Sequence, residues 1–398
     1  MSEDAQSRLF AKAVSVRELL RESIDTARLS MDLAFNAVVY GDADLAKEVL
    51  SLERKMDELE LQIMARLAIA VRRLEDAVRA VSLYKLTSSL NKITDAASDI
   101  VKAYLDFRAN LELRGPYSNG DEIVARLEVG LEKPVTIESV LERLDVIVDV
   151  VAIKRDERWL TEPPLGTMLR RGDVVIVKGS GGAVKAFASA VKSAPKRALT
   201  PPPEASARLL ELSKTVNVMF SLALAALLTR ARWVAEYVLE LEEYVDESLL
   251  DFERKVLSSP FPDNEKGALL FAAFAIEHVA DAALEIVIPV LQGLEPHPLI
   301  LDVLEETRER ISAIEIDERD EGTTLADLEY EEKGVLVLAV KRGRNWFIMP
   351  PYTDFRLKSG DVLIVKYYEE SETFVEGEEA GEDREELIED AWEEANLS

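Results

Sequence analysis

The sequence contains an internal duplication, and this feature limits the possible folds more than any other. Residues 150–164, VVAIKRDERWLTEPP, align without a gap with residues 337–351, VLAVKRGRNWFIMPP. Downstream, GDVVIVK from Gly172 recurs as GDVLIVK from Gly360. Segments that recur together at nearly the same spacing are not explained by chance. The 398 residues therefore form two copies of one composite unit, and a single small domain is excluded.

Each copy begins with a helical part. Apolar residues recur every three or four positions from Leu9 to about Asn110, without a proline, and the pattern pauses at Gly41. The matching stretch of the second copy runs from about Glu204 to Gln292 and is broken by prolines within residues 258–267. The related acidic segments LERKMDE and LEEYVDE lie within these two stretches. The simplest prediction is three long helices in each copy.

Each copy ends with a β-rich part. Runs of β-branched residues bounded by turns occupy residues 146–153 and 174–177 in one copy, and 335–340 and 362–365 in the other. Short segments with helical spacing lie between them, and a proline-rich linker separates the two copies. The predicted fold class is therefore an α+β multidomain protein, in which two three-helix bundles alternate with two small α+β modules.

The composition removes several classes of function. The chain has no cysteine and only two histidines, His278 and His297, which excludes thiolate chemistry and Cys-ligated zinc. Its net charge of −28 opposes nucleic acid and anionic lipid, and favours cations or basic partners. A charged fraction of 31% without cysteine is typical of proteins from thermophiles.

The two ends of the chain and its most apolar stretches indicate where in the cell the protein is expected. The N-terminus lacks a basic start followed by an apolar core, so we expect a cytoplasmic protein without a secretory signal. The most apolar stretches, residues 216–228 and 268–276, fall short of the roughly 20 residues of a membrane span and are expected to be buried helices. Residues 369–398 hold 14 acidic side chains and one base, which predicts a solvated tail.

An acidic stripe marks the helical part of the second copy. Glu277, Asp281 and Glu285 follow one another at four-residue steps, so their carboxylates share one helix face. Glu242 and Asp246 have the same spacing, and an antiparallel neighbouring helix would bring them close. Carboxylates without thiolates suit a hard divalent metal ion, which would remove the repulsion between them. The alternative is that these residues are the solvated faces of charged helices.

The first copy carries a weaker version of this stripe. Asn91 stands where the second copy has its first carboxylate, while Asp95 and Asp99 match the other two. The partner pair persists as Glu53 and Asp57. A neutral amide weakens a cation site, so we expect the second copy to bind metal better if either copy binds it.

These segments resemble two known families. The acidic Glu-x-x-x-Asp segments within long helices resemble PhoU domains, whose motifs of this type bind metal ions. The Lys-Arg doublet, the paired prolines and the Gly-Asp turn resemble the C-terminal domain of TrkA (RCK) proteins, called TrkA-C. The resemblance implies the order PhoU, TrkA-C, PhoU, TrkA-C, as in archaeal cation-transport regulators. The implied domains are a PhoU-like domain at 1–112, a TrkA-C domain at 120–195, a linker at 196–204, a PhoU-like domain at 205–308, a TrkA-C domain at 309–370 and an acidic tail at 371–398.

The basic doublets of the α+β modules are candidate ligand residues: Lys154, Arg155, Lys341 and Arg342. A guanidinium fork suits phosphate, and TrkA-C pairs in the resembled family bind small ligands such as cyclic dinucleotides. The alternative is that each doublet simply ends a strand in solvent. No dinucleotide cofactor is expected, because GSGGAV from Gly179 has Val184 in place of the third glycine of the fingerprint.

The resemblance implies a non-enzymatic cytoplasmic regulator of potassium or divalent cation transport. Its implied partner is an integral-membrane cation transporter or channel, which would hold it at the membrane periphery. One alternative is a PhoU-like regulator of phosphate uptake. Another, less favoured alternative is a metal-dependent hydrolytic enzyme, since no histidine, serine or lysine stands beside the acidic stripe as an obvious acid or nucleophile. A monomer and a homodimer both fit two similar copies.

Overall fold

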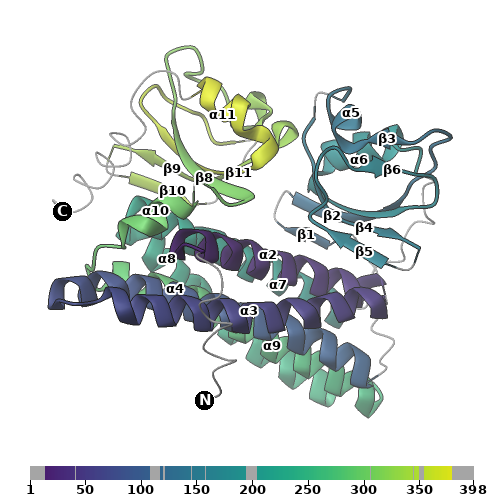
Figure 1. Ribbon diagram of the computed structural model, residues 1–398, viewed down its shortest axis with the longest axis horizontal. Helices are drawn as coiled ribbons and strands as arrows, with labels where there is room; N and C mark the ends of the chain where they lie inside the picture. The colour runs from purple at the N-terminus through teal and green to yellow at the C-terminus, as the bar shows by residue number, and fades with distance from the viewer. Residues whose placement is uncertain are drawn as a thin grey trace. The chain divides into compact units, whose positions relative to one another are not determined.

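Figure 1 shows the computed structural model of the chain. It describes residues 14–40, 42–107, 117–119, 122–144, 146–156, 158–193, 204–304, 306–343, 345–348 and 354–378. The prolines at 350–351, residues 194–203 of the predicted linker region and residues 379–398 of the predicted tail lie outside this part. The chain divides into a helical unit, within residues 1–35, 46–110 and 219–308, and a sheet unit that holds the remainder.

Six long helices, three from each copy, account for the predicted bundles. They are α2 (Val16–Tyr40), α3 (Ala43–Ala70), α4 (Leu74–Phe107), α7 (Glu204–Thr229), α8 (Arg232–Ser258) and α9 (Asp263–Leu291), followed by the short α10 (Pro298–Leu304). Pro262 precedes α9 directly, and Pro289 lies in its last turn, as expected from the fixed φ and missing N–H of proline. The fold class is confirmed.

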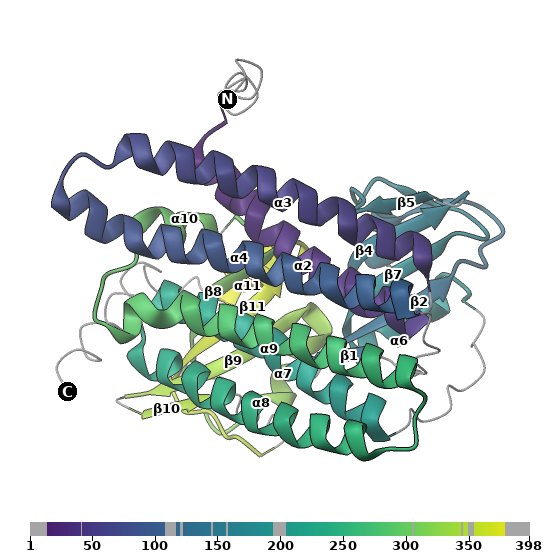
Figure 2. The same ribbon diagram turned by 90° about the horizontal axis from the view of Figure 1, so that it is seen from below.

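The two bundles are joined rather than separate. The most extensive contact between helices is that of α4 with α9, which lie side by side in Figure 2. Alanines at buried positions of α9, including Ala273, Ala280 and Ala283, allow a close approach of the helix backbones. The third helix of each copy therefore serves as the interface between the copies within the helical unit.

Helix α7 changes one expectation. Its segment Ala207–Thr229 has 23 residues and a mean hydropathy of 1.5, so by length and composition it could cross a membrane. The stretch predicted at 216–228 is a buried helix as expected, but the apolar helix is longer because it extends the stretch at its N-terminal side. However, 83% of its most apolar 18-residue stretch is buried, which is typical of the core helix of a globular protein.

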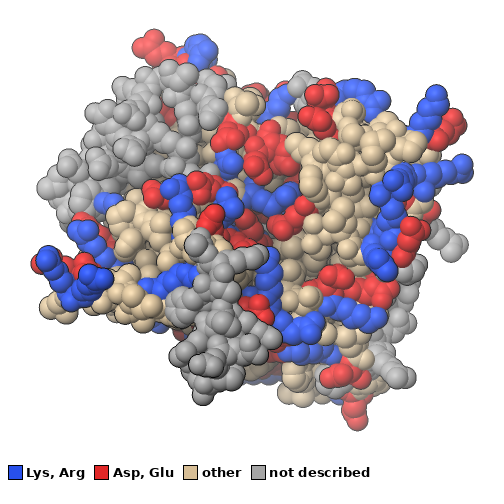
Figure 3. All heavy atoms as spheres, viewed as in Figure 1, with Lys and Arg blue, Asp and Glu red and all other residues tan. Residues whose placement is uncertain are grey.

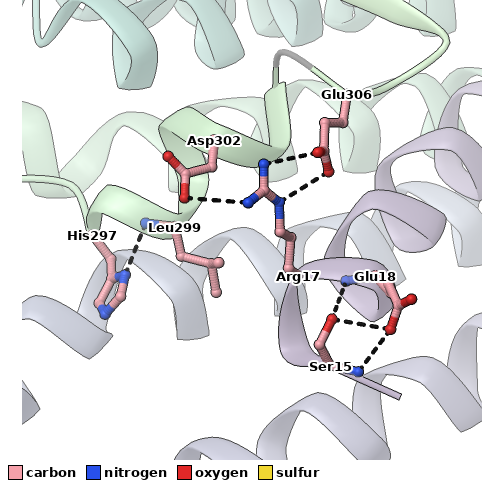
Figure 4. A network of polar contacts seen from close by, with 7 residues as sticks. All are labelled: Ser15, Arg17, Glu18, His297, Leu299, Asp302 and Glu306. Atoms are coloured by element: carbon pink, nitrogen blue, oxygen red, sulfur yellow. Dashed lines mark hydrogen bonds and ion pairs between the residues drawn. The ribbon is translucent and has the colours of Figure 1, made fainter.

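Figure 4 shows how the start of α2 is fixed. Ser15 and Glu18 form a capping box, in which the Glu18 N–H donates to Ser15 Oγ and the Ser15 N–H donates to Glu18 Oε2. Arg17 donates to both carboxylate oxygens of Glu306, at 3.0 and 2.8 Å.

His297 Nδ1 accepts the Leu299 N–H at 3.1 Å, so this histidine caps the start of α10. Burial lowers the pKa of His297, which keeps the imidazole neutral for that role.

The described part of the sheet unit contains two main antiparallel sheets with the same core strand order, and a separate two-stranded sheet of β3 and β6. The first sheet has the order β1-β2-β7-β4-β5, and the second has the order β8-β11-β9-β10. Thus β2, β7, β4 and β5 correspond to β8, β11, β9 and β10. The first copy consists of β1 (Tyr117–Asn119), β2 (Glu122–Glu128), β3 (Val135–Thr136), α5 (Ile137–Leu141), β4 (Asp149–Arg155), β5 (Arg158–Thr161), β6 (Met168–Leu169), β7 (Val174–Ser180) and α6 (Gly181–Ala190).

The second copy repeats this arrangement with shorter helical pieces. It consists of β8 (Glu309–Glu315), the 3-10 helices η1 (Ala326–Leu328) and η2 (Tyr330–Lys333), β9 (Val335–Arg342), β10 (Asn345–Ile348), β11 (Val362–Tyr368), η3 (Glu369–Ser371) and α11 (Glu372–Glu378). Each copy has its own buried apolar core, which includes Phe187 and Val177 in the first, and Val365 and Tyr367 in the second.

The second module continues past the boundary predicted at residue 370. Helix α11 follows β11 as α6 follows β7, and Val375 packs in the module core with 1% of its surface exposed. Glu372 pairs with Arg310 of β8. The acidic composition of this segment suggested a tail, but its apolar side chains place its first turns in the folded module.

Candidate functional site

Four carboxylates from two helices face one another in the second bundle. We call Glu242 and Asp246 of α8, with Glu277 and Asp281 of α9, the second acidic cluster. Burial and then Asp246 raise the pKa of both Glu277 and Asp281, and burial with Asp246 and Asp281 raises that of Glu242. The antiparallel pairing of helices expected from the sequence therefore does bring these side chains together. No described lysine or arginine forms an ion pair with any of the four.

Glu285, the third residue of the predicted stripe, does not join this cluster. Its carboxylate lies 2.6 Å from Lys92 Nζ and 3.5 Å from Lys85 Nζ, both on α4. Burial opposes ionisation here, but the hydrogen bond and charge of Lys92 and Lys85 outweigh it and lower the pKa of Glu285. This residue therefore links the two bundles within the helical unit.

The corresponding carboxylates of the first bundle are Glu53 and Asp57 of α3 and Asp95 and Asp99 of α4, which we call the first acidic cluster. Burial raises the pKa of Asp95 to about 6, with further contributions from Asp57, Glu53 and Asp99. Unlike the second cluster, this one contains its own cation. Lys102 Nζ lies 2.9 Å from Glu53 Oε1 and 3.5 Å from Asp99 Oδ1.

The difference between the clusters is visible in the sequence once the contact is known. The position that matches Lys102 in the second copy is Ile288, which carries no charge. Lys102 was missed because it lies 49 residues from Glu53 and outside the Glu-x-x-x-Asp pattern. The first cluster thus has a tethered ammonium group in addition to the neutral Asn91. In the second, none of the four carboxylates forms an ion pair in the described chain, although the charges of His278 and Lys92 partly lower the pKa of Asp281.

The donor set of the second cluster suits a hard cation, but its oxygens do not converge. Among the described residues, no three Asp, Glu or His side chains lie close enough together to hold a metal ion as they stand. The carboxylates also raise one another's pKa, and this is compatible with the lack of convergence because electrostatic coupling reaches further than coordination. Occupancy would require side-chain rotations that bring the oxygens within about 2.0–2.6 Å of one point.

The basic doublets belong to a repeated ion-pair motif. In the first module, Arg155 Nε and Nη2 donate to the two carboxylate oxygens of Asp173 at 2.9 and 2.6 Å, and Nη2 also donates to the Met168 carbonyl. Asp173, 3% exposed, also accepts the Arg170 N–H. Gly172, with φ of +87°, makes the turn that presents this aspartate. The arginine of the doublet and the Gly-Asp turn are therefore the two halves of one contact.

The second module repeats the contact atom for atom. Arg342 donates to Asp361 at 2.8 and 2.6 Å and to the Arg356 carbonyl at 2.7 Å. Asp361 also accepts the Lys358 N–H. The side-chain hydrogen bond to the aspartate is the largest cause of the raised pKa of Arg155 and of Arg342. The contact between the arginine and the aspartate accounts for the presence of both the Lys-Arg doublet and the Gly-Asp turn in each copy.

The lysines of the doublets are also engaged within the protein. Lys154 Nζ lies 3.3 Å from Asp44 and 3.6 Å from Asp42, and Asp42 also pairs with Arg126 at 3.1 Å. Lys341 is buried and has polar partners of its own. The ligand role of Lys154, Arg155, Lys341 and Arg342 stays a prediction.

A cavity of about 500 Å³ opens beside Arg155 in the first module. It lies against β4 and β5 and the loop before β6. Its walls are Ile153, Arg155, Asp156, Arg158, Trp159, Leu160 and Thr167. Sequence reasoning identified Arg155 but did not predict a cavity, since the spacing of residues within one strand does not reveal what the neighbouring loop leaves open.

The two modules contact each other within the sheet unit. Lys178 of β7 lies 2.7 Å from Glu309 of β8, and Lys366 of β11 lies 3.2 Å from the other oxygen of the same carboxylate. All three residues are buried. The Ile147 N–H donates to the Glu332 carbonyl at 2.9 Å. Lys178 and Lys366 occupy matching positions in the repeat, so the contact brings equivalent strands of the two copies together.

Charged side chains of both signs lie on the drawn face of the chain, and the exclusion of nucleic acid as a partner stays a prediction. On the face shown in Figure 3, basic and acidic side chains are interspersed, and no broad basic area is seen among the described residues. A protein that tracks a phosphate backbone needs such an area.

Comparison with known proteins identifies the domains. The PhoU domain family matches residues 20–103 and 209–288, and the TrkA-C domain family matches residues 312–372. The chain therefore contains PhoU domains in tandem and a TrkA-C domain. Both are regulatory domain families rather than enzyme families, and they connect the chain with the regulation of phosphate or ion transport.

Solved structures show more distant likenesses. PhoU from Pseudomonas aeruginosa is 14% identical, with 73% of this chain and 97% of that chain covered and a TM-score of 0.35. The GsuK RCK domain is 12% identical over 67% of this chain and 65% of that chain, with a TM-score of 0.18. The GsuK channel bound to NAD is 13% identical over 77% of this chain and 66% of that chain, with a TM-score of 0.19. This chain thus spans slightly less than two thirds of the GsuK chains. No curated protein matches the chain.

Proposed function

We propose that the chain is a non-enzymatic cytoplasmic regulator of potassium or divalent cation transport. The observation that carries this proposal is the combination of tandem PhoU domains with two sheet modules that share a strand order and contact each other in one unit. A module pair within one chain offers a two-fold arrangement that ligand binding can bias. The partner is an integral-membrane cation transporter or channel, which holds the regulator at the membrane periphery.

The second acidic cluster is the proposed site of a divalent metal ion. None of its four carboxylates forms an ion pair in the described chain. Burial together with their mutual repulsion raises the pKa of Glu242, Glu277 and Asp281 despite the opposing charges of His278 and Lys92. A bound Mg²⁺, Mn²⁺ or Ca²⁺ would relieve that repulsion. The first cluster is not proposed as an equivalent site, because Lys102 already neutralises part of its charge.

The modules are the proposed sensing part, and the ligand class expected from the resemblance is a small phosphate-bearing molecule such as a cyclic dinucleotide. The Arg155 guanidinium borders an open cavity even while it is bound to Asp173. It can therefore contact a ligand with its remaining N–H groups and its flat face.

A second candidate is a PhoU-like regulator of phosphate uptake. It is favoured by the two PhoU segments, 20–103 and 209–288, which together cover more of the chain than the TrkA-C segment. The two candidates share the regulatory role and differ in the transporter.

The experiment that tests the proposal is a pull-down of membrane proteins from the native cell with the tagged full chain, combined with uptake assays. We expect a cation transporter to be retained, and loss of the chain to change uptake of rubidium or manganese. Retention of a phosphate transporter, with altered phosphate uptake only, would favour the second candidate. Unchanged uptake of all three ions would contradict both.

A further inference from the structure

At two positions in the wall of the first-module cavity, the second module carries larger, aromatic residues. The repeat aligns Leu160 and Thr167, two of the cavity's wall residues, with Phe347 and Phe355. Leu160 is 46% exposed at the cavity mouth. Because the two modules share their strand order and their arginine–aspartate contact, the positions can be compared directly.

In the second module two aromatic rings cover the arginine. The Arg342 guanidinium carbon lies 5.5 Å from the ring centre of Phe347 and 5.1 Å from that of Phe355. The two rings are 5.0 Å apart and tilted by 65°. A guanidinium group held by a carboxylate at its edge can bind an aromatic ring on its face. The face of the Arg342 guanidinium is therefore already covered by aromatic rings of the same chain, those of Phe347 and Phe355.

In the first module Leu160 and Thr167 stand at the two phenylalanine positions, and the aromatic wall of the cavity is Trp159, whose ring centre lies 5.8 Å from Lys154 Nζ. Arg155 is held in the same orientation by Asp173, but Leu160 and Thr167 leave its surroundings open as a cavity of about 500 Å³. That volume lies within the range of small-molecule sites. A flat ring that enters it would replace what Phe347 and Phe355 provide in the second module.

The rim of the cavity carries charged groups that the second module lacks at the matching positions. Asp156 and Arg158 line it, whereas the matching positions hold Gly343 and Asn345. Asp156 can accept hydrogen bonds, Arg158 can donate them, and Thr167 can do both. A purely hydrocarbon ring would not use these groups, but a ring with donors and acceptors on its edge would.

We propose that the first module binds a small planar heteroaromatic molecule of the nucleobase type, with the ring on the Arg155 guanidinium and the ring edge on Asp156 and Arg158. The inference rests on the proposed sensing role of the modules, and it names the ligand class and assigns the site to one copy only. The second module is the filled, non-binding copy.

The test is titration calorimetry of the full chain with adenosine, guanosine, cytidine, uridine, AMP and ribose 5-phosphate. We expect at least one nucleoside to bind with one site per chain, and ribose 5-phosphate to show no binding. Absence of binding by every nucleoside would overturn the proposal, and so would AMP and ribose 5-phosphate binding equally well. The measurement needs no transporter, so its failure is distinguishable from failure of the proposed regulatory function.

Two variants test whether the nucleoside binds in the first-module cavity. Leu160→Phe with Thr167→Phe installs the rings of the second module and should lower the affinity of the bound nucleoside at least tenfold. Arg158→Asn, which copies the second module at an exposed position and should fold normally, should lower it about tenfold through one lost charge-assisted hydrogen bond. Phe347→Leu is the matched control and should leave the affinity unchanged. Unchanged affinity in both of the first two variants would show that the ligand binds elsewhere.

Discussion

Replacing Asp95 by asparagine should stabilise the protein at neutral pH. Burial and three neighbouring carboxylates raise the pKa of Asp95 to about 6 from its ordinary value of 3.8. The folded state therefore binds this proton more tightly than the unfolded state, and stability falls as pH rises from about 4 to about 6. A shift of that size corresponds to about 3 kcal/mol for a fully desolvated group. Because the carboxyl is only partly buried, solvent screening reduces the expected effect to about 1 kcal/mol.

The assay is urea unfolding of the wild type and of Asp95→Asn at several pH values between 4 and 7. We expect the variant to be more stable by about 1 kcal/mol at pH 7, with a gain that disappears near pH 4. Glu58→Gln, which removes an exposed carboxylate of the same helix pair, should change stability by less than about 0.5 kcal/mol at every pH. A loss of stability in Asp95→Asn at pH 7, or a gain that does not vary with pH, would refute the electrostatic reasoning.

Two further predictions concern charged contacts. Lys102→Met should lower stability at pH 7 by up to about 1 kcal/mol, because the first acidic cluster loses its cation, and the loss should shrink near pH 5 as Asp95 gains its proton. Thermal melts at both pH values check this, and an equal loss at both would contradict it. Asp173→Asn and Asp361→Asn should each cost about 2–4 kcal/mol in urea unfolding, since each leaves a partly buried guanidinium without its carboxylate. A large loss in only one of them would contradict the equivalence of the two modules.

The duplicated architecture could be predicted because helical spacing and β-branched runs are local signals. The predicted strands at 174–177 and 362–365 lie within β7 and β11, and both bundles have three long helices. By contrast, β2 and β8 were not predicted, although they pair along the full length of β7 and β11. Their charged residues, as in EIVARLE, weaken the β signal, and only pairing with a neighbouring strand makes them strands.

The candidate site was predictable only in part. Four-residue spacing identified the carboxylates, but it could not separate Glu285, which turns to Lys92 of another helix, from Asp281, which faces α8. The Lys-Arg doublet and the Gly-Asp turn were both recognised, yet their contact joins residues 18 positions apart and depends on sheet pairing. The filling of one cavity by Phe347 could be seen only when the two modules were compared in three dimensions.

The central claim is that the second helical bundle holds a divalent cation and the first does not. The most direct measurement is titration calorimetry of the full chain with Mn²⁺, on the wild type and on Glu277→Gln with Asp281→Asn. The account predicts one ion per chain for the wild type and none for the double variant, which should still unfold cooperatively. Two equivalent ions per chain, or binding that survives the double substitution, would contradict it.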